Sequence, residues 1–254
     1  MNILVPMAGR GSRFSAEYPV PKPLIPVNGK PMVVRATDCM PPHERLAFVC
    51  VDEHLANFPI EAALLGAYPD ATIVAQKGWA DGQACSCEIG VLGANLPLDE
   101  SLLLSNCDQD LLYNHAAWQR TLDAKPDVII WTFRHTPCTR DNPTAYGWID
   151  CDMNGRVRRI CPKIPISDTP WEDHAETGLF WFREAQMFLD GLAIIKNKKI
   201  KTRGEYYTAN VVAELIAGGA NVRVFEVERF ICWGTVKDMQ DYEYWQSYFA
   251  RRAK

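Results

Sequence analysis

The first half of the chain alternates short apolar runs with segments of helical pattern, and this alternation constrains the fold more than any other feature. The predicted strands cover residues 3–5, 46–51, 71–75, 101–105 and 127–133, and the predicted helices between them cover 32–39, 60–67, 83–92 and 113–124. Apolar runs without polar alternation are typical of parallel strands that are covered on both faces. The order therefore predicts an α/β fold with helices on both faces of a central sheet.

The second half of the chain has a different pattern. Asn154-Gly155 is a strong hairpin signal between predicted strands at 147–150 and 156–160. Further strands are predicted at 178–182 and 221–227, and further helices at 184–192, 207–217 and 239–251. Hairpin strands beside a parallel unit predict a mixed, mostly parallel sheet. No linker or internal repeat interrupts the pattern, so we expect a single domain over residues 1–254, with two halves that meet near residue 135.

Composition and charge exclude several classes of protein. Hydrophobic residues make up 48% and charged residues 23% of the 254 residues, which predicts an ordered globular chain. The net charge of −4 argues against a broad nucleic-acid surface. The sequence shows neither an apolar run of membrane-spanning length nor a secretion signal, so we expect a cytoplasmic protein without a membrane or nucleic-acid partner. It predicts nothing about the oligomeric state.

The nine cysteines argue against a disulfide framework or a zinc site. Their number is odd, their spacing is irregular, and no C-x-x-C motif is present. We expect most of them to be reduced and to pack as small apolar residues.

A glycine loop follows the first predicted strand, in the segment MAGRGSRF. Gly9 and Gly11 let the backbone turn sharply and bring its amides close to an anion such as a triphosphate. Arg13, and Lys22 between two prolines, can add charged hydrogen bonds to phosphate oxygens. The loop is neither a Walker A motif nor a G-x-G-x-x-G motif, since Phe14 occupies the third glycine position. The alternative is a tight turn without a ligand.

Asp108 is the candidate metal ligand. It follows the predicted strand 101–105, and ligands of open parallel sheets bind at the carboxyl ends of the strands. A carboxylate at that position suits Mg²⁺, which prefers oxygen ligands. The alternative is that Asp108 caps the helix that follows.

Together these segments resemble the sugar-phosphate nucleotidyltransferase family. MAGRGSRF and PKPLIPVNGKPM are similar to the family pattern G-x-G-[ST]-R-[FL], P-K-x-L-x-P-V and K-P. Further segments follow in the family's order over nearly the whole chain: SNCDQ, AYGWID, NGRV, PKIPIS, ETGLFWF, GEYYTANVVAELI and WGTVKD. The resemblance implies a Rossmann-like three-layer sandwich of the GT-A type. It also implies an enzyme that joins a nucleoside triphosphate to a phosphorylated small-molecule acceptor and releases pyrophosphate.

The resemblance also implies roles for individual residues. Arg13, Lys22 and Lys163 would be catalytic, and Asp108 would hold Mg²⁺. The nucleotide would be bound by Ala8, Gly9, Gly11, Ser12, Gln76, Gly82, Gln83 and Asn106, in a half of about 1–135. Of these, Gln76, Gly82 and Gln83 would form a base-reading segment that contacts the edge of the base. The acceptor would be bound by Tyr146, Gly147, Glu176 and Thr177, in a half of about 136–254. An acceptor phosphate is already anionic, so catalysis would need positioning and charge stabilisation, and no general base.

The sequence departs from the family pattern at two positions. Cys232 stands where the family often has a second metal-binding aspartate, and Glu205 or Asp110 are the candidates to replace it. Pro162 stands where a glutamate usually holds sugar hydroxyls, which argues against a standard hexose 1-phosphate. PKIPISDTP and RGEYYTAN resemble a branch from capsule gene clusters that makes cytidylyl derivatives and includes a phosphoglutamine cytidylyltransferase. This favours CTP and a capsule-type acceptor.

Two other functions remain open from the sequence. Asp108-Gln109-Asp110 is a D-x-D motif, as in metal-dependent glycosyltransferases, although that function leaves PKPLIPVNGKPM unexplained. Loss of the second aspartate also fits a non-catalytic nucleotide-binding subunit of the same fold. Against this stands the presence of all five key residues: Gly11, Arg13, Lys22, Asp108 and Lys163.

Overall fold

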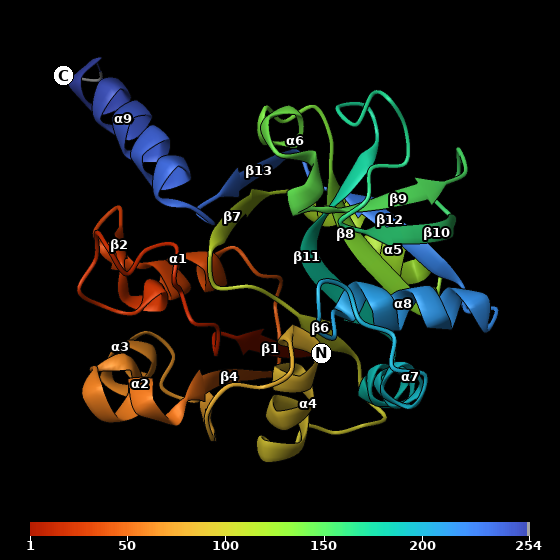
Figure 1. Ribbon diagram of the computed structural model, residues 1–254, viewed down its shortest axis with the longest axis horizontal. Helices are drawn as coiled ribbons and strands as arrows, with labels where there is room; N and C mark the ends of the chain where they lie inside the picture. The colour runs from red at the N-terminus through yellow and green to blue at the C-terminus, as the bar shows by residue number, and fades with distance from the viewer. Residues whose placement is uncertain (253–254) are drawn as a thin grey trace.

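The computed structural model describes residues 1–252, which build a nine-stranded sheet with helices on both faces (Figure 1). The strands follow the order β10-β9-β11-β6-β1-β4-β5, while β8 pairs with β11 and with β12. Their bounds are β1 Asn2–Pro6, β4 Arg45–Val51, β5 Thr72–Gln76, β6 Leu102–Leu104, β8 Val128–Phe133, β9 Gly147–Cys151, β10 Val157–Pro162, β11 His174–Phe182 and β12 Val222–Glu226.

The sheet is mixed and mostly parallel, as the sequence predicts. Strands β6, β1, β4 and β5 are parallel neighbours, and β12 is parallel to β8. Strand β11 pairs antiparallel with β6, β8 and β9, and β10 pairs antiparallel with β9. Strands β10 and β11 therefore run against the other strands of the sheet.

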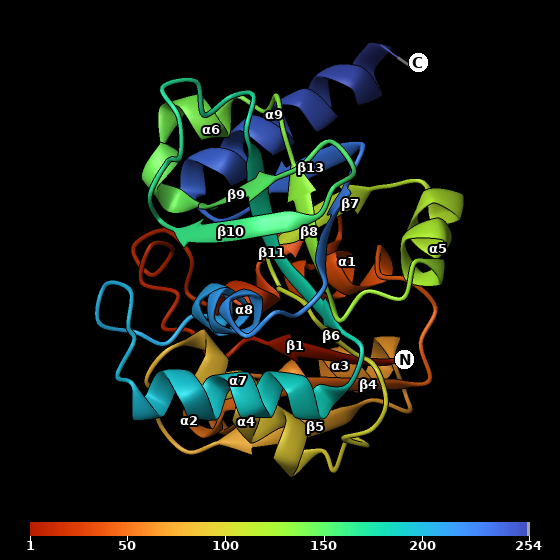
Figure 2. The same cartoon turned by 90° about the vertical axis from the view of Figure 1, so that its right-hand side faces the viewer.

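Alternate side chains of the central strand point into two different apolar layers. Leu4 packs in a cluster with residues of α4, α7 and α8, whereas Ile3 and Val5 pack in a second cluster with residues of α1, α3 and α5. Figure 2 shows the helices on the two sides of the sheet. The helix bounds are α1 Met32–Asp38, α2 Asp52–Asn57, α3 Ile60–Ala67, α4 Gln83–Gly93, α5 His115–Asp123, α6 Cys138–Asp141, α7 Ala185–Asn197, α8 Thr208–Ala217 and α9 Val236–Arg252. This is the predicted three-layer arrangement.

The predicted strands and helices are present, with shifted ends in several cases. Strand β11 begins at His174, four residues before the predicted start, and α7 continues to Asn197. Two single-turn 3₁₀ helices lie at Lys22–Leu24 and Pro143–Ala145.

Two small antiparallel sheets are absent from the sequence-based prediction. One pairs β7, Gln109–Leu112, with β13, Arg229–Cys232, and the other pairs β2, Pro26–Val27, with β3, Lys30–Pro31. The strands β7 and β13 lie more than a hundred residues apart in the chain, so no local pattern predicts their pairing. Their pairing places the residue before β7, Asp108, beside the segment that follows β13.

All nine cysteines carry free thiols, and three of them are buried, as expected for reduced packing residues. Among residues 1–252, every helix is too short or too polar to cross a membrane.

Candidate active site

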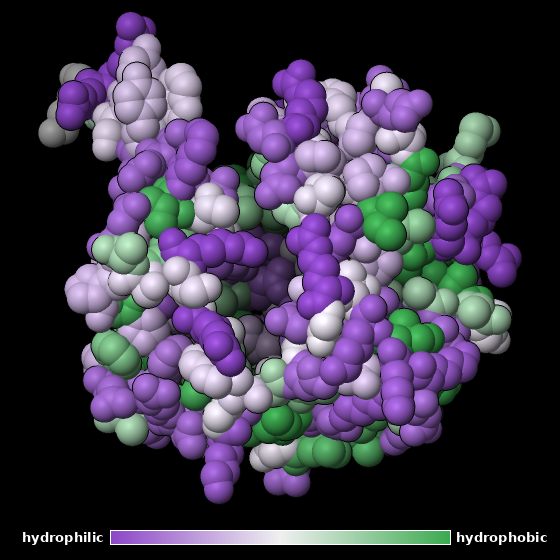
Figure 3. Space-filling model, in the orientation of Figure 1, coloured by the Kyte–Doolittle hydropathy of each residue, from purple (hydrophilic) through white to green (hydrophobic). Residues whose placement is uncertain are grey.

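A cavity of about 600 Å³ opens at the carboxyl ends of β1 and β6. It is visible as the hollow near the centre of Figure 3. Ten of the residues that the sequence analysis selected line it: Ala8, Gly9, Gly11, Ser12, Arg13, Lys22, Gly82, Gln83, Asn106 and Asp108. The glycine loop and Asp108 therefore converge on one site, as their positions at strand ends predict.

The glycine loop lies against the segment that carries Lys22. Gly11 has a left-handed backbone with φ of 61°, and a Cβ atom there would lie 3.4 Å from the Lys22 Cβ. Glycine adopts this conformation without strain, which explains the residue type. Phe14 is buried in a cluster with Ile25 and Trp233 and anchors the end of the loop.

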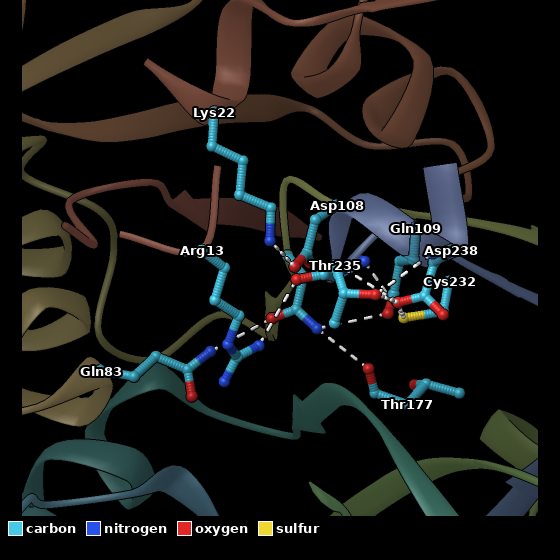
Figure 4. Close-up of polar contacts among 11 residues, drawn as sticks. Arg13, Lys22, Gln83, Asp108, Gln109, Thr177, Cys232, Thr235 and Asp238 are labelled. Atoms are coloured by element: carbon cyan, nitrogen blue, oxygen red, sulfur yellow. Dashed lines mark hydrogen bonds and ion pairs between the residues drawn. The ribbon is translucent and has the colours of Figure 1, made fainter. Parts of the chain in front are cut away.

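Lys22 and Asp108 form an ion pair at the wall of the cavity (Figure 4). Burial of Lys22 disfavours its charged form, but the neighbouring Asp108 carboxylate more than compensates, and the pKa of Lys22 is raised. Lys22 is therefore a permanent cation at neutral pH. Its ammonium and the Asp108 carboxylate face the space that a polyphosphate would occupy.

Asn106 links the cavity to β11. Its amide nitrogen donates to the Thr177 carbonyl at 2.9 Å, and its amide oxygen accepts from Gln83 at 3.2 Å. Gly178 has a φ of 88°, and a side chain there would collide with the Asn106 amide. On the same side of the cavity, the Arg13 guanidinium donates to the Gly234 carbonyl at 3.4 Å. Figure 4 shows these contacts around Arg13, Gln83 and Thr177.

A loop between two left-handed glycines forms another wall of the cavity. Gly82 has a φ of 106°, and a Cβ atom there would lie 2.6 Å from the Tyr206 backbone nitrogen. Trp79 in this loop lines the cavity and is 40% exposed, with the Arg10 guanidinium 5.5 Å from its ring centre. Trp79 and Arg10 were not predicted from the sequence as site residues. The signal was a tryptophan between glycines, in GWADG, at the predicted base-reading segment.

Gln76 lies behind that loop and does not line the cavity. Its side chain is buried, and its amide nitrogen donates to the Gly78 carbonyl at 2.9 Å. The structure thus places Gln76 as a support of the loop, and its contact with a base stays a prediction.

Three of the four predicted acceptor residues, Tyr146, Gly147 and Glu176, form a second cluster with Lys163, next to the cavity. The fourth, Thr177, is buried, and its hydroxyl donates to the Trp131 carbonyl at 3.1 Å, so its contact with an acceptor stays a prediction. The Glu176 carboxylate accepts from the Gly147 amide at 3.1 Å, and its other oxygen is buried without a hydrogen-bond partner. Burial raises the pKa of Glu176, and the nearby Lys163 cation opposes this shift. An unpaired buried carboxylate oxygen is costly unless a ligand supplies a donor.

Lys163 and Tyr146 complete this cluster. The Lys163 backbone is left-handed, with φ of 64°, and its amide donates to the Tyr146 carbonyl at 3.0 Å. Its ammonium donates to the Ala145 carbonyl at 2.5 Å. Burial lowers the pKa of Lys163, Glu176 counteracts this effect, and Arg13 adds to it.

The carboxylates near Cys232 have defined partners. Asp238 accepts from the Thr235 amide at 2.9 Å and from its hydroxyl at 2.6 Å, and its own amide donates back to Thr235. This is a capping arrangement at the start of α9. The Cys232 sulfur lies 3.8 Å from Asp238 and accepts from the Gly234 amide at 3.2 Å. Burial raises the pKa of the Cys232 thiol, which keeps it protonated.

The two suggested replacements for a second metal ligand lie in different places. Glu205 lines the cavity. Asp110 lies 3.6 Å from Arg35 and accepts from the Leu111 amide, so it does not line the cavity beside Asp108. The two aspartates of the D-x-D motif therefore do not face the cavity together.

The acidic residues at the cavity fit Mg²⁺ in one binding mode. Within residues 1–252, no group of three or more His, Cys, Asp or Glu side chains is placed to hold a metal ion by itself. Mg²⁺ commonly binds through one or two carboxylates together with substrate phosphates and water. Asp108 at the cavity wall fits that mode as a single protein ligand.

Comparison with known protein families shows which family the chain belongs to. Residues 3–151 match the model of the MobA-like NTP transferase domain, which is more than half of the chain. The chain belongs to this family. The predicted kinship with sugar-phosphate nucleotidyltransferases is therefore confirmed at the level of the family.

Curated relatives of this family member include two bifunctional GlmU proteins. The protein from Burkholderia orbicola (strain MC0-3) is 29% identical over 225 residues, which cover 87% of this chain and 46% of the relative. The protein from Burkholderia mallei (strain SAVP1) has the same identity and coverage. The chain thus spans about half the length of the curated relatives it matches.

Solved structures with this fold include two of named activity. The nucleoside-diphosphate-sugar pyrophosphorylase from Vibrio cholerae RC9 has a TM-score of 0.75 at 21% identity and covers 94% of this chain and 98% of its own. The inositol-1-phosphate CTP transferase from T. maritima has a TM-score of 0.72 at 16% identity and covers 95% and 93%. At these identities the likeness establishes the fold, and the predicted fold class is confirmed.

Proposed function

We propose that the protein is a nucleotidyltransferase that joins a nucleoside triphosphate to a phosphorylated small-molecule acceptor and releases pyrophosphate. The observation that carries this proposal is the convergence of the glycine loop, Arg13, Lys22 and Asp108 on one cavity. A triphosphate needs amide donors and cations at close range, and this cavity offers both. Membership of the family supports the same function.

The reaction is an in-line displacement at the α-phosphorus. An oxygen of the acceptor's phosphate forms the new bond to phosphorus, the bond to the bridging oxygen of the β-phosphate breaks, and pyrophosphate leaves with the bonding electrons. Arg13 and Lys22 offset the negative charge that gathers on the α-phosphate and the leaving group. Bound Mg²⁺, held by Asp108 and the phosphates, would supply further positive charge.

The nucleotide base is proposed to lie against the loop of residues 78–82. Trp79 presents a half-exposed ring to the cavity, and an aromatic ring is a stacking surface for any base. Gln83 lies beside the cavity with its amide toward Asn106, where it can contact a base edge. We propose CTP as the substrate because of the sequence resemblance to cytidylyl-transferring enzymes. The fold shared with an inositol-1-phosphate CTP transferase is consistent with this choice.

The acceptor is proposed to bind at the cluster of Lys163, Glu176 and Gly147, in the half of about 136–254. Lys163 would contact the acceptor's phosphate. The unpaired oxygen of Glu176 would accept a hydrogen bond from a hydroxyl or an amide of the acceptor. We propose a precursor of a capsule or another surface polysaccharide, either a sugar phosphate or a phosphoglutamine-like compound, on the basis of the resemblance.

The test is pyrophosphate release with each of CTP, UTP, ATP, GTP and dTTP, with Mg²⁺ and a panel of phosphorylated sugars, polyols and amino-acid derivatives. Release that requires one nucleotide and one acceptor would establish the function. A metal-dependent glycosyltransferase would release no pyrophosphate from free nucleotide. Nucleotide binding without release in any combination would favour a non-catalytic nucleotide-binding subunit.

A further inference from the structure

Helix α9 extends away from the body of the molecule. Its first two turns pack on the body, where Met239 is buried and Tyr242 contacts the ring of Trp233. From residue 243 to residue 252 every residue is exposed. Figures 1 and 2 both show this half of the helix projecting into solvent.

The projecting half carries four exposed aromatic residues, which we call the aromatic stripe: Tyr244, Trp245, Tyr248 and Phe249. Their exposed fractions are 64%, 54%, 38% and 63%. The spacing i, i+1, i+4, i+5 places them on one face of the helix. Their rings touch one another, with Trp245 centred 5.7 Å from Tyr248 and 6.0 Å from Phe249. The stripe is thus one continuous apolar surface.

A helix in this situation needs a partner. Isolated helices shorter than about 12–15 residues are only marginally stable in water, and most helical stability in proteins comes from packing of an apolar face. The ten exposed residues 243–252 lack such packing within the described chain. Contiguous aromatic surface of this kind marks an interaction site.

The charges of α9 identify the partner. Acidic residues, Asp241 and Glu243, precede the stripe, and basic residues, Arg251 and Arg252, follow it. An antiparallel second copy of the same helix therefore brings opposite charges together at both ends. A parallel copy would place like charges side by side.

We propose that the protein forms a two-fold symmetric dimer through antiparallel pairing of α9. With the axis between Gln246 and Ser247, Tyr244 lies opposite the partner's Phe249, and Trp245 lies opposite the partner's Tyr248. Asp241 then lies opposite the partner's Arg252. One patch that is complementary to itself is the hallmark of a two-fold interface. The body of each copy sits at the opposite end of the helix pair, so the two bodies do not compete for space along the axis.

A membrane surface is the other occupant to consider, and the charges disfavour it. Helix α9 contains three basic and three acidic residues, in the sequence VKDMQDYEYWQSYFARR. Helices that bind anionic lipid carry an excess of Lys and Arg on their polar face. A helix without net charge has no such attraction.

The first experiment measures the mass in solution by sedimentation equilibrium over a wide range of concentration. The wild-type chain is expected at twice its mass of 28.7 kDa. Trp245→Ala with Phe249→Ala should raise the dimer dissociation constant about 100-fold, as loss of two interface anchors does. Leu92→Ala removes a comparably exposed apolar residue, 54% exposed on α4, and should leave the mass unchanged. A monomeric wild type at every concentration would overturn the proposal.

Charge exchange tests the antiparallel arrangement itself. Asp241→Arg alone and Arg252→Asp alone each place like charges opposite one another and should weaken the dimer, whereas the double variant should restore it. Asp241 also pairs with Lys237 at 2.6 Å, so Lys237→Ala is the control for losing that surface pair and should have no effect. Failure of the double variant to recover would contradict the proposed pairing.

Sedimentation with lipid vesicles tests whether the aromatic stripe binds a membrane surface instead of a second copy of the chain. Sedimentation with vesicles of phosphatidylcholine and phosphatidylglycerol should leave the wild type in the supernatant. Binding to vesicles that requires Trp245, by a protein that is monomeric without them, would replace the dimer proposal with a membrane surface.

Discussion

Lys22 and Asp108 stand 86 residues apart in the chain, and their side chains form an ion pair at the wall of the cavity. The pair joins the proposed phosphate-binding lysine to the proposed metal ligand. Removing either residue therefore changes the environment of the other. Lys22→Met is expected to lower kcat about 100-fold or more, because it removes a cation that offsets charge in the transition state. Pyrophosphate release measures this effect, and an unchanged rate would remove Lys22 from the catalytic group.

Asp108→Asn preserves the shape of the side chain and removes its charge. We expect the concentration of Mg²⁺ needed for half-maximal activity to rise about 10-fold or more, since one carboxylate ligand is lost. A titration of activity against Mg²⁺ measures the shift. Glu205→Gln is the matched variant of another cavity carboxylate, and a larger shift there would transfer the metal assignment to Glu205.

Trp79→Ala should weaken nucleotide binding by about 10-fold, because stacking on an aromatic ring contributes about 1–3 kcal/mol per base. Trp79→Phe should retain most of the affinity. The affinities are measured by equilibrium dialysis with labelled nucleotide. In a separate measurement, nucleotide should quench a component of tryptophan fluorescence in the wild type that Trp79→Phe lacks. Trp245→Phe is the control for an exposed tryptophan far from the cavity, and its quenching should equal that of the wild type.

Lys163 predicts a pH dependence on the alkaline side. Burial lowers the pKa of its ammonium below the ordinary lysine value of 10.5, so its charge is present below the lowered pKa and is lost as the pH rises through it. The KM for the acceptor should therefore rise at a pH below 10.5, while the affinity for nucleotide changes less. Lys163→Arg keeps its charge at high pH, so the rise in KM should move to higher pH in this variant. If the rise in KM occurs at the same pH in this variant as in the wild type, another group and not Lys163 causes it.

Gly82→Ala tests the close approach of the 78–82 loop to the chain near Tyr206. The new Cβ would lie 2.6 Å from backbone atoms of Tyr206, and its φ of 106° is unfavourable for alanine. We expect a loss of about 1–3 kcal/mol in the free energy of unfolding, measured by urea denaturation. Gly78→Ala is the matched control, since it has a φ of 62° and open space around the new atom. It should destabilise less, and an equal loss would show that backbone conformation alone accounts for the effect.

Local patterns predicted the layers of the fold well. Ile3, Leu4 and Val5 form an apolar run that supplies both faces of the sheet, and such a run is recognisable in the sequence. The pairing of β7 with β13 was not predictable in this way, because it joins segments more than a hundred residues apart. That pairing positions Asp108 beside Cys232, so the immediate surroundings of the proposed metal ligand could be seen only in the structure.

The candidate site was predictable where backbone geometry demanded a residue type. Gly11 was selected because a tight glycine loop needs such a residue, and it has a left-handed conformation and lines the cavity. Gly82, which was implied by the family resemblance, also has a left-handed conformation there. Trp79 was missed because an aromatic residue in a loop looks like ordinary packing until its exposure is known. The direction of the Gln76 side chain could not be predicted from the sequence either, because its burial behind the loop depends on how the loop folds.

The most direct test of the central claim follows two labels through the reaction with CTP and the phosphorylated acceptors. With CTP labelled at the α-phosphorus, the account predicts that the label appears in a product that also contains the acceptor. With CTP labelled at the γ-phosphorus, it predicts that the label appears in pyrophosphate, and that Lys22→Met suppresses both. Transfer of the γ-label to the acceptor would contradict the proposed nucleotidyl transfer. So would release of the γ-label in pyrophosphate while the α-label stays in a nucleotide that lacks the acceptor.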